Sequence, residues 1–214
     1  MFSNPLETLL SRRRFMATIL GSIAAIGLSA PALADWLDAS QVRSFGAMIL
    51  DMYPKGPVGK TRYASGDNPF LQAAWFDRGN YTISPNPLFK NLWIQGGPRA
   101  RTFFGDNPSD APALNKIPFV KWNRRYAYVS STHMMLPRGL NLVYDQSGGE
   151  IASGILLHAK FVNTFAERAK IEAARKEHFN AGQESAIYAA NDPDNLTFWG
   201  KCALSKSCKI ALIP

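Results

Sequence analysis

The sequence predicts an α/β fold with a mixed sheet, flanking helices and long irregular loops. Two dense apolar runs, 45–52 and 154–157, have the length of buried strands. The second run is followed by a charged segment whose apolar residues recur at helical spacing, which predicts a helix over about 160–178. Residues 54–91 are rich in Pro, Gly, Asn and Asp, and their six aromatic residues argue that this long loop is ordered.

The remaining elements are shorter. The turn Gly96-Gly97-Pro98 predicts the start of a helix, because proline suits the first helical position. Pro118 makes the strand over 117–122 an edge strand or places it at a strand start, because proline has no N–H to donate. Other elements are predicted at 36–40 (the end of a helix), 92–95 and 126–130 (strands) and 183–190 (a helix).

Length and composition limit the organisation and the partners. A chain of 214 residues with 46% hydrophobic content can bury one sizeable core and is short for two full domains, and no clear boundary follows residue 35. The formal net charge of +8 suits phosphate-bearing ligands or an anionic membrane surface, or is that of an ordinary basic protein. Lys and Arg are scattered and no nucleic-acid motif is present, so nucleic acid is not the expected partner.

The N-terminus resembles a twin-arginine export signal over residues 1–34. Arg12, Arg13 and Arg14 precede an uncharged apolar stretch, 17–30, and an A-x-A-like cleavage site at 32–34. The stretch is shorter than the ~20 residues that span a bilayer, and no other segment qualifies. A genuine signal predicts a periplasmic protein, whereas a misassigned N-terminus predicts a cytoplasmic one.

The C-terminal region holds both cysteines, Cys202 and Cys208. Export would permit a disulfide between them, and two unrelated thiols are the alternative. The triplet Asp192-Pro193-Asp194 has a composition typical of a turn, so we interpret it as loop rather than as a metal motif.

Six blocks of sequence together resemble one family. They are RSFGAMILDMYPKGP (43–57), NLWIQGGPRARTFF (91–104), LNKIPFVKW (114–122), YAYVSSTHMMLP (126–137), GILLHAKF (154–161) and EHFNAGQESAIY (177–188). In this order they resemble the C-terminal half of bacterial glycosyltransferase family 2-like proteins, which have a GT-A fold. The similarity covers about 35–200, and residues 201–214 form a diverged tail.

The resemblance implies a partial GT-A-like sheet and the transfer of a sugar from a nucleotide sugar to a glycan or lipid acceptor. It also implies a divalent ion, Mn²⁺ or Mg²⁺. The family carries a donor-binding half with an acidic metal motif upstream, and the export-like segment stands in its place here. We therefore expect loose metal binding, little activity by this chain alone and a partner chain covering an exposed sheet edge. An exported, non-catalytic carbohydrate-binding or interaction module is the alternative.

Several basic residues are predicted to face the diphosphate. His158 lies where a strand ends and a helix follows, and by resemblance it is the last metal ligand; a hydrogen-bonded core histidine is the alternative. Lys160, Arg99 and Arg101 are predicted phosphate contacts. Because arginines two apart do not share a helix face, only one is expected to point inward. His178 is expected to stabilise a helix C-terminus.

Acceptor binding and proton transfer have their own candidates. His133 is a predicted general base or acceptor contact, since histidine titrates near neutral pH, and a structural loop histidine is the alternative. Asp51 and Glu184 are the acids predicted as alternative bases. Trp75 and Trp93 are predicted substrate-binding residues, because an aromatic face packs on the apolar side of a sugar ring, although most tryptophans are core.

Overall fold

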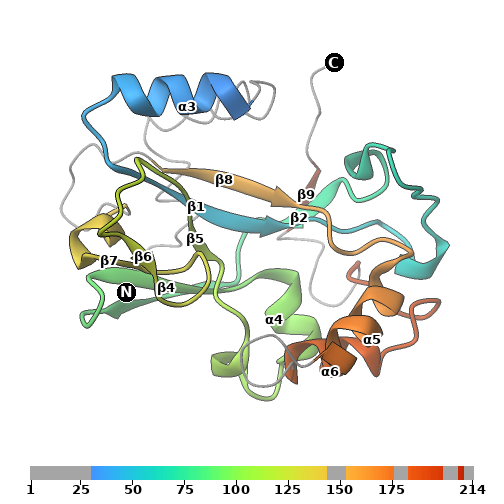
Figure 1. Cartoon of the computed structure of the whole chain (residues 1–214). Helices are drawn as coiled ribbons and strands as arrows, with labels where there is room; N and C mark the ends of the chain where they lie inside the picture. Colours follow the sequence, from blue (N-terminus) through green and yellow to red (C-terminus); the bar gives the residue numbers. More distant parts are fainter. Residues whose placement is uncertain (1–29, 144–152, 176–182, 200–206, 210–214) are drawn as a thin grey trace. The chain divides into compact units, whose positions relative to one another are not determined.

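The computed structural model describes residues 30–143, 153–175, 183–199 and 207–209. Within them the chain is α/β, as the sequence predicts. The helices are α3 (Ala30–Ala39), α4 (Gly97–Phe103), α5 (Phe165–Arg175) and α6 (Gln183–Ala189). The strands are β1 (Ser44–Asp51), β2 (Trp75–Asp77), β3 (Tyr81–Asn86), β4 (Asn91–Gly96), β5 (Asn115–Val120), β6 (Ala127–Tyr128), β7 (Met135–Leu136), β8 (Ser153–His158) and β9 (Ser207–Lys209). Figure 1 shows these elements along the chain.

The described residues form two compact units. Unit 1 contains 30–49, 81–95, 113–143 and 153–156, and unit 2 contains the remainder. The chain alternates between the units, so no single position in the sequence divides them. This interleaving explains why composition shows no boundary after residue 35.

A three-stranded sheet organises unit 1, with β1 between β5 and β8. β1 and β5 are antiparallel, with Ser44 opposite Val120 and Met48 opposite Asn115. β8 runs in the same direction as β1 (Figure 1). β1 is buried along almost its whole length, which agrees with its apolar sequence. β5 lies at an edge of this sheet, as Pro118 predicts.

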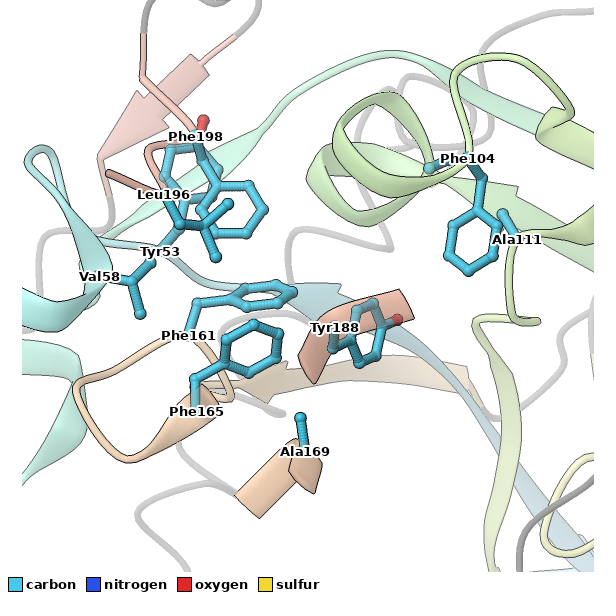
Figure 2. Packing of buried hydrophobic residues seen from close by; sticks show 11 residues of the cluster. Tyr53, Val58, Phe104, Ala111, Phe161, Phe165, Ala169, Tyr188, Leu196 and Phe198 are labelled. Carbon is cyan, nitrogen blue, oxygen red and sulfur yellow. The ribbon is translucent and has the colours of Figure 1, made fainter. Parts of the chain in front are cut away.

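The core of unit 2 is aromatic. Phe161 and Phe198 have ring centroids 4.3 Å apart, and Phe103 and Tyr188 meet at 4.7 Å. Figure 2 shows Phe161 and Phe165 side by side in this cluster, which also contains Tyr188. The apolar stripe that predicted a helix is therefore buried, as amphipathic helices require.

The predicted helix over 160–178 begins later than expected, at Phe165. Residues 162–164 form a bend and a turn, and the N–H of Arg168 donates to Thr164 O at 3.1 Å. Val162, Asn163 and Thr164 all have low helix propensity, which is consistent with the delayed start. The helix end, with His178, lies outside the described residues.

Two other expectations need similar adjustment. The strand predicted at 126–130 shortens to the two residues of β6, and the long loop contains the short strands β2 and β3. In the described part of the chain, no helix is long and apolar enough to cross a membrane. The export-like segment up to residue 29 lies outside the described residues. Cys202 does too, and with it the disulfide that export would permit between Cys202 and Cys208.

Candidate functional site

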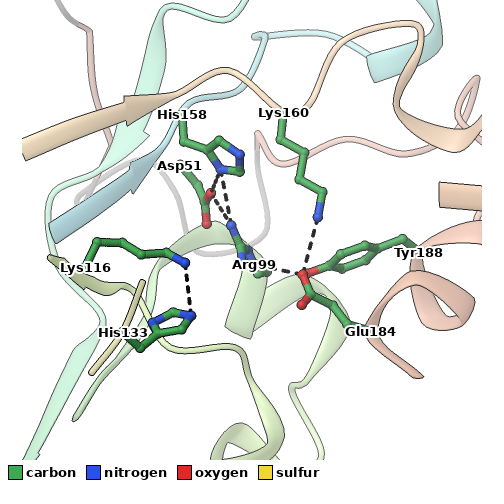
Figure 3. A network of polar contacts seen from close by, with 8 residues as sticks. All are labelled: Asp51, Arg99, Lys116, His133, His158, Lys160, Glu184 and Tyr188. Carbon is green, nitrogen blue, oxygen red and sulfur yellow. Dashed lines mark hydrogen bonds and ion pairs between the residues drawn. The ribbon is translucent and has the colours of Figure 1, made fainter. Parts of the chain in front are cut away.

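Three charged or polar side chains of unit 2 meet where two strands end (Figure 3). Asp51 is the last residue of β1, His158 is the last residue of β8, and Arg99 lies in the first turn of α4. Asp51 Oδ1 accepts hydrogen bonds from Arg99 Nη2 at 2.6 Å and from His158 Nδ1 at 2.8 Å. The backbone N–H of Met52 donates to His158 O at 2.9 Å, which joins the two strand ends. Carboxyl ends of neighbouring parallel strands are a common place for ligands.

Two glycines set the position of Arg99. Gly96 and Gly97 have φ angles of 137° and 69°, which side chains other than glycine rarely adopt. Pro98 then begins α4, as the sequence predicts. The N–H of Gly97 donates to Asn80 O at 2.9 Å, so this amide is already engaged. The turn therefore aims the guanidinium rather than offering its first amide to an anion.

Asp51 and Arg99 form a buried ion pair. The side chain of Asp51 is 1% exposed and that of Arg99 is 6% exposed. Burial alone would raise the pKa of Asp51, but the charge of Arg99 and the hydrogen bond from His158 outweigh burial and lower this pKa to about 2. Burial likewise opposes the charge of Arg99, and Asp51 outweighs it, so the pKa of Arg99 is raised. Both groups are therefore charged at neutral pH.

The partners of His158 fix its orientation. Because Asp51 Oδ1 accepts at 2.8 Å, His158 Nδ1 carries the hydrogen, and in the neutral ring Nε2 carries the lone pair. Arg99 Nη2 also lies 3.3 Å from Nδ1. The side chain of His158 is 41% exposed. A carboxylate that orients an imidazole in this way is found behind metal-ligating and general-base histidines.

Glu184 is the second acceptor of the cluster. Its Oε1 accepts from Tyr188 Oη at 2.6 Å and from Lys160 Nζ at 3.3 Å, and Arg99 Nη1 lies 3.5 Å away. Burial would raise the pKa of Glu184, but the charges of Lys160 and Arg99 lower it. Burial and the charge of Arg99 lower the pKa of Lys160, against the opposing effect of Glu184. Lys160 Nζ also stands 4.3 Å from the centroid of the Tyr188 ring, within cation–π range.

If His158 is a metal ligand, as predicted, further ligands are needed near its ring. Within the described ranges, no group of three or more His, Cys, Asp or Glu side chains could hold a metal ion. Asp51 already neutralises Arg99, and Nε2 of His158 is a single nitrogen ligand. His158 could therefore supply one ligand to an ion whose other ligands come from elsewhere. The described residues do not by themselves form a resident metal site.

Arg101 corrects the expectation that only one arginine of α4 points inward. Its Nε donates to Asp77 Oδ2 at 2.7 Å and its Nη2 to Asp77 Oδ1 at 3.1 Å. Nη2 also donates to Phe198 O at 2.7 Å, and Tyr53 Oη donates to Asp77 Oδ1 at 2.7 Å. Arg99 and Arg101 point in different directions from α4, but each is paired with a buried carboxylate, Asp51 for Arg99 and Asp77 for Arg101. Arg101 is 13% exposed, which favours a structural role over phosphate binding.

His133 belongs to unit 1 and has both ring nitrogens engaged, and Figure 3 shows the contact with Lys116. Nδ1 lies 2.7 Å from Asn115 O, so it carries the hydrogen. Nε2 lies 3.0 Å from Lys116 Nζ, which donates to it. The ring of Trp93 is 5.9 Å away in a tilted arrangement. The structural alternative for His133 is therefore favoured, and a role in proton transfer stays a prediction.

The two predicted sugar-stacking residues are both half-buried. Trp75 begins β2, and its ring meets Trp199 edge-on at 4.5 Å beside the aromatic core. Trp93 lies in β4 against His133. The triplet 192–194 falls in a polar turn, in which Asp192 Oδ1 accepts from the N–H of Asp194 at 3.0 Å, as expected for loop.

Sequence reasoning missed Tyr188, Asp77 and Lys116. Tyr188 follows Glu184 by four residues on α6, and this spacing places two side chains on one helix face, so the signal was present. Asp77 ends the short strand β2 and Lys116 lies in β5, and neither carries a distinguishing local pattern.

Comparison with known proteins adds no identification: no family model, curated protein or solved structure matches this chain. The function is therefore argued from the geometry of the cluster and from the sequence blocks that supply it.

Proposed function

We propose that this chain is a glycosyltransferase-related protein that contacts the diphosphate of a nucleotide sugar and serves sugar transfer to a glycan or lipid acceptor. One observation carries the proposal: four of the six sequence blocks deliver a side chain to a single cluster in unit 2. The contributions are Asp51 from 43–57, Arg99 from 91–104, His158 and Lys160 from 154–161, and Glu184 from 177–188. Blocks this far apart in sequence have no local reason to converge, so a shared site explains their spacing.

In such a transfer the acceptor hydroxyl oxygen bonds to the anomeric carbon while the bond from that carbon to the diphosphate breaks. The diphosphate leaves with the electron pair, so groups that meet its negative charge favour the reaction. His158 and Lys160 are the partly exposed nitrogen-bearing side chains of the cluster, at 41% and 31% exposure. A divalent ion, when bound, would neutralise the same diphosphate.

Asp51 is assigned a positioning role. Its pKa of about 2 and its 1% exposure make it a poor proton acceptor, whereas its hydrogen bond holds the ring of His158. Glu184 is the more accessible acid, at 34% exposure, and its lowered pKa keeps it ionised at neutral pH. Glu184 is therefore the acid to test as a base for the acceptor hydroxyl.

Binding of nucleoside diphosphate to the full chain is the first test, with and without Mg²⁺. We expect UDP or GDP to raise the melting temperature, and His158→Ala and Lys160→Ala to abolish that rise. Lys170→Ala is the matched control, because Lys170 is exposed on α5 of the same unit. An equal rise in all three variants, or none in the wild type, would overturn the proposal.

The same samples test the alternative function. A nucleotide sugar incubated with the chain should release diphosphate slowly, and Glu184→Gln should stop this release while Glu167→Gln, an exposed change on α5, leaves it intact. Binding of a free oligosaccharide that ignores nucleoside diphosphate and is lost in Trp75→Ala would instead indicate a non-catalytic carbohydrate-binding module.

A further inference from the structure

Within the described residues, the basic surplus is concentrated in unit 1. The described residues of unit 1 contain seven Lys and Arg against two Asp and Glu, whereas those of unit 2 contain eleven against ten. Residues 113–143 include five Lys and Arg and no acidic residue. Such one-sided charge produces a positive potential that attracts anionic partners.

An open hollow of unit 1 gathers part of this charge. Arg43, Tyr126 and Pro137 are shared by two adjoining depressions of about 370 Å³ and about 560 Å³. Arg125 and Leu136 line one of them, and Leu142 lines the other. Among the residues that the structure describes, no acidic side chain lines either depression. We call this surface the basic hollow, defined by Arg43, Arg125, Tyr126, Leu136 and Leu142.

The arginines of the basic hollow are free to meet a partner. Arg43 and Arg125 are both exposed, and within the described residues neither forms an ion pair. This arrangement differs from that of Arg99, which is buried against Asp51. An exposed arginine with no intramolecular carboxylate keeps its donors available for phosphate oxygens.

Apolar side chains stand beside these charges. Leu136 is 42% exposed and Leu142 is 50% exposed in the basic hollow itself. Trp122, which directly precedes the hollow-lining Asn123 in the sequence, is 67% exposed. Exposed leucine and tryptophan beside arginine are the composition of surfaces that lie in the headgroup region of a bilayer.

We propose that unit 1 docks on an anionic phospholipid bilayer through the basic hollow. Arginine contacts the lipid phosphates, and the exposed leucines enter the boundary between headgroups and acyl chains. Nucleic acid would use the same charge and could stack on Tyr126, but Leu136 and Leu142 are exposed aliphatic side chains with no face for base stacking, so the membrane fits the surface better. The proposal does not depend on the glycosyltransferase assignment, because it involves only residues of unit 1.

The test is sedimentation of the full chain with vesicles of phosphatidylcholine, with or without phosphatidylglycerol, at physiological salt. We expect binding to the anionic vesicles and a partition coefficient about 25-fold lower in Arg43→Gln/Arg125→Gln, since each basic residue near such a surface contributes about fivefold. The apolar stretch 17–30 is present in every variant, so its contribution cancels in this comparison.

The matched control is Arg168→Gln/Lys170→Gln, which removes two exposed charges from α5 in unit 2 and should leave binding unchanged. Leu136→Ser/Leu142→Ser should weaken binding while all charges remain. Equal binding by the arginine double variant and its control would overturn the proposal. Loss of RNA binding in the same double variant, without any vesicle binding, would overturn it in favour of nucleic acid.

Discussion

The two units of this protein differ in whether their arginines are buried and paired or exposed. In unit 2 the arginines of α4 are turned inward, and each is matched by a buried carboxylate, Asp51 for Arg99 and Asp77 for Arg101. In unit 1 the arginines Arg43 and Arg125 lie exposed in an open hollow and have no such partner among the described residues. Over the described residues, Lys and Arg nearly balance Asp and Glu in unit 2, whereas they exceed them by five in unit 1.

This difference distinguishes charged residues that are paired within the fold from charged residues that can bind a ligand. A buried charge must be paired, because removing it from water costs several kcal/mol, about 3–5 when its partner is lost. An exposed charge has little effect on folding and can be used for a ligand instead. The same residue type therefore has different functions in the two units, and substitutions should show this directly.

Arg99→Ala should have the largest effect. The change leaves the Asp51 carboxylate buried without its countercharge, so we expect the free energy of unfolding to fall by about 3–5 kcal/mol. Urea unfolding at neutral pH measures it, with Arg168→Ala on the exposed side of α5 as control, expected within about 0.5 kcal/mol. A loss no larger than that of the control would show that the ion pair does not hold unit 2 together.

Asp51→Asn should change the acid dependence of stability. The folded pKa of Asp51, about 2, lies below its ordinary value of 3.8, so this group stabilises the fold fully above about pH 4 and loses that effect as pH falls through 2. Wild type should therefore lose about 2 kcal/mol more than the variant between pH 5 and pH 2. Unfolding is followed across this range with Asp38→Asn, an exposed change in α3 of unit 1, expected to keep the wild-type profile. Parallel acid profiles for wild type and Asp51→Asn would contradict the buried pair.

Lys116→Met should have a smaller effect in unit 1. The variant removes the donor to His133 Nε2, and among the described residues no buried carboxylate loses its countercharge, so we expect a loss of about 1 kcal/mol. Lys90→Met, at an exposed position of the same unit, is the control for charge alone. A loss as large as that of Arg99→Ala would mean that unit 1 also depends on buried charge.

Arg125→Gln should have the smallest effect on stability, within about 0.5 kcal/mol, because the side chain is exposed and unpaired among the described residues. The same variant should weaken binding to anionic vesicles by about fivefold. Thermal unfolding and vesicle sedimentation on one preparation measure both. A clear fall in stability would show that Arg125 contributes to folding and would remove the contrast between the units.

Local patterns predicted most of the elements and the placement of several site residues. The apolar run before His158 is β8, the turn before Pro98 opens α4, and the apolar stripe of α5 is buried. The inward direction of Arg101 could not be predicted, because it depends on Asp77, 24 residues away in the sequence. The proposed activity and its metal remain predictions from resemblance, since no comparison identifies a relative.

The sequence by itself determined the α/β class and placed His158 at a strand end, because periodicity and glycine–proline turns act over a few residues. Only the tertiary structure decided which charges meet. Asp51 joins Arg99 across 48 positions and His158 across 107, and no short-range pattern encodes such distances. Burial then decided the outcome, because a carboxylate in the core must find a cation, whereas the exposed arginines of unit 1 need no partner in the chain.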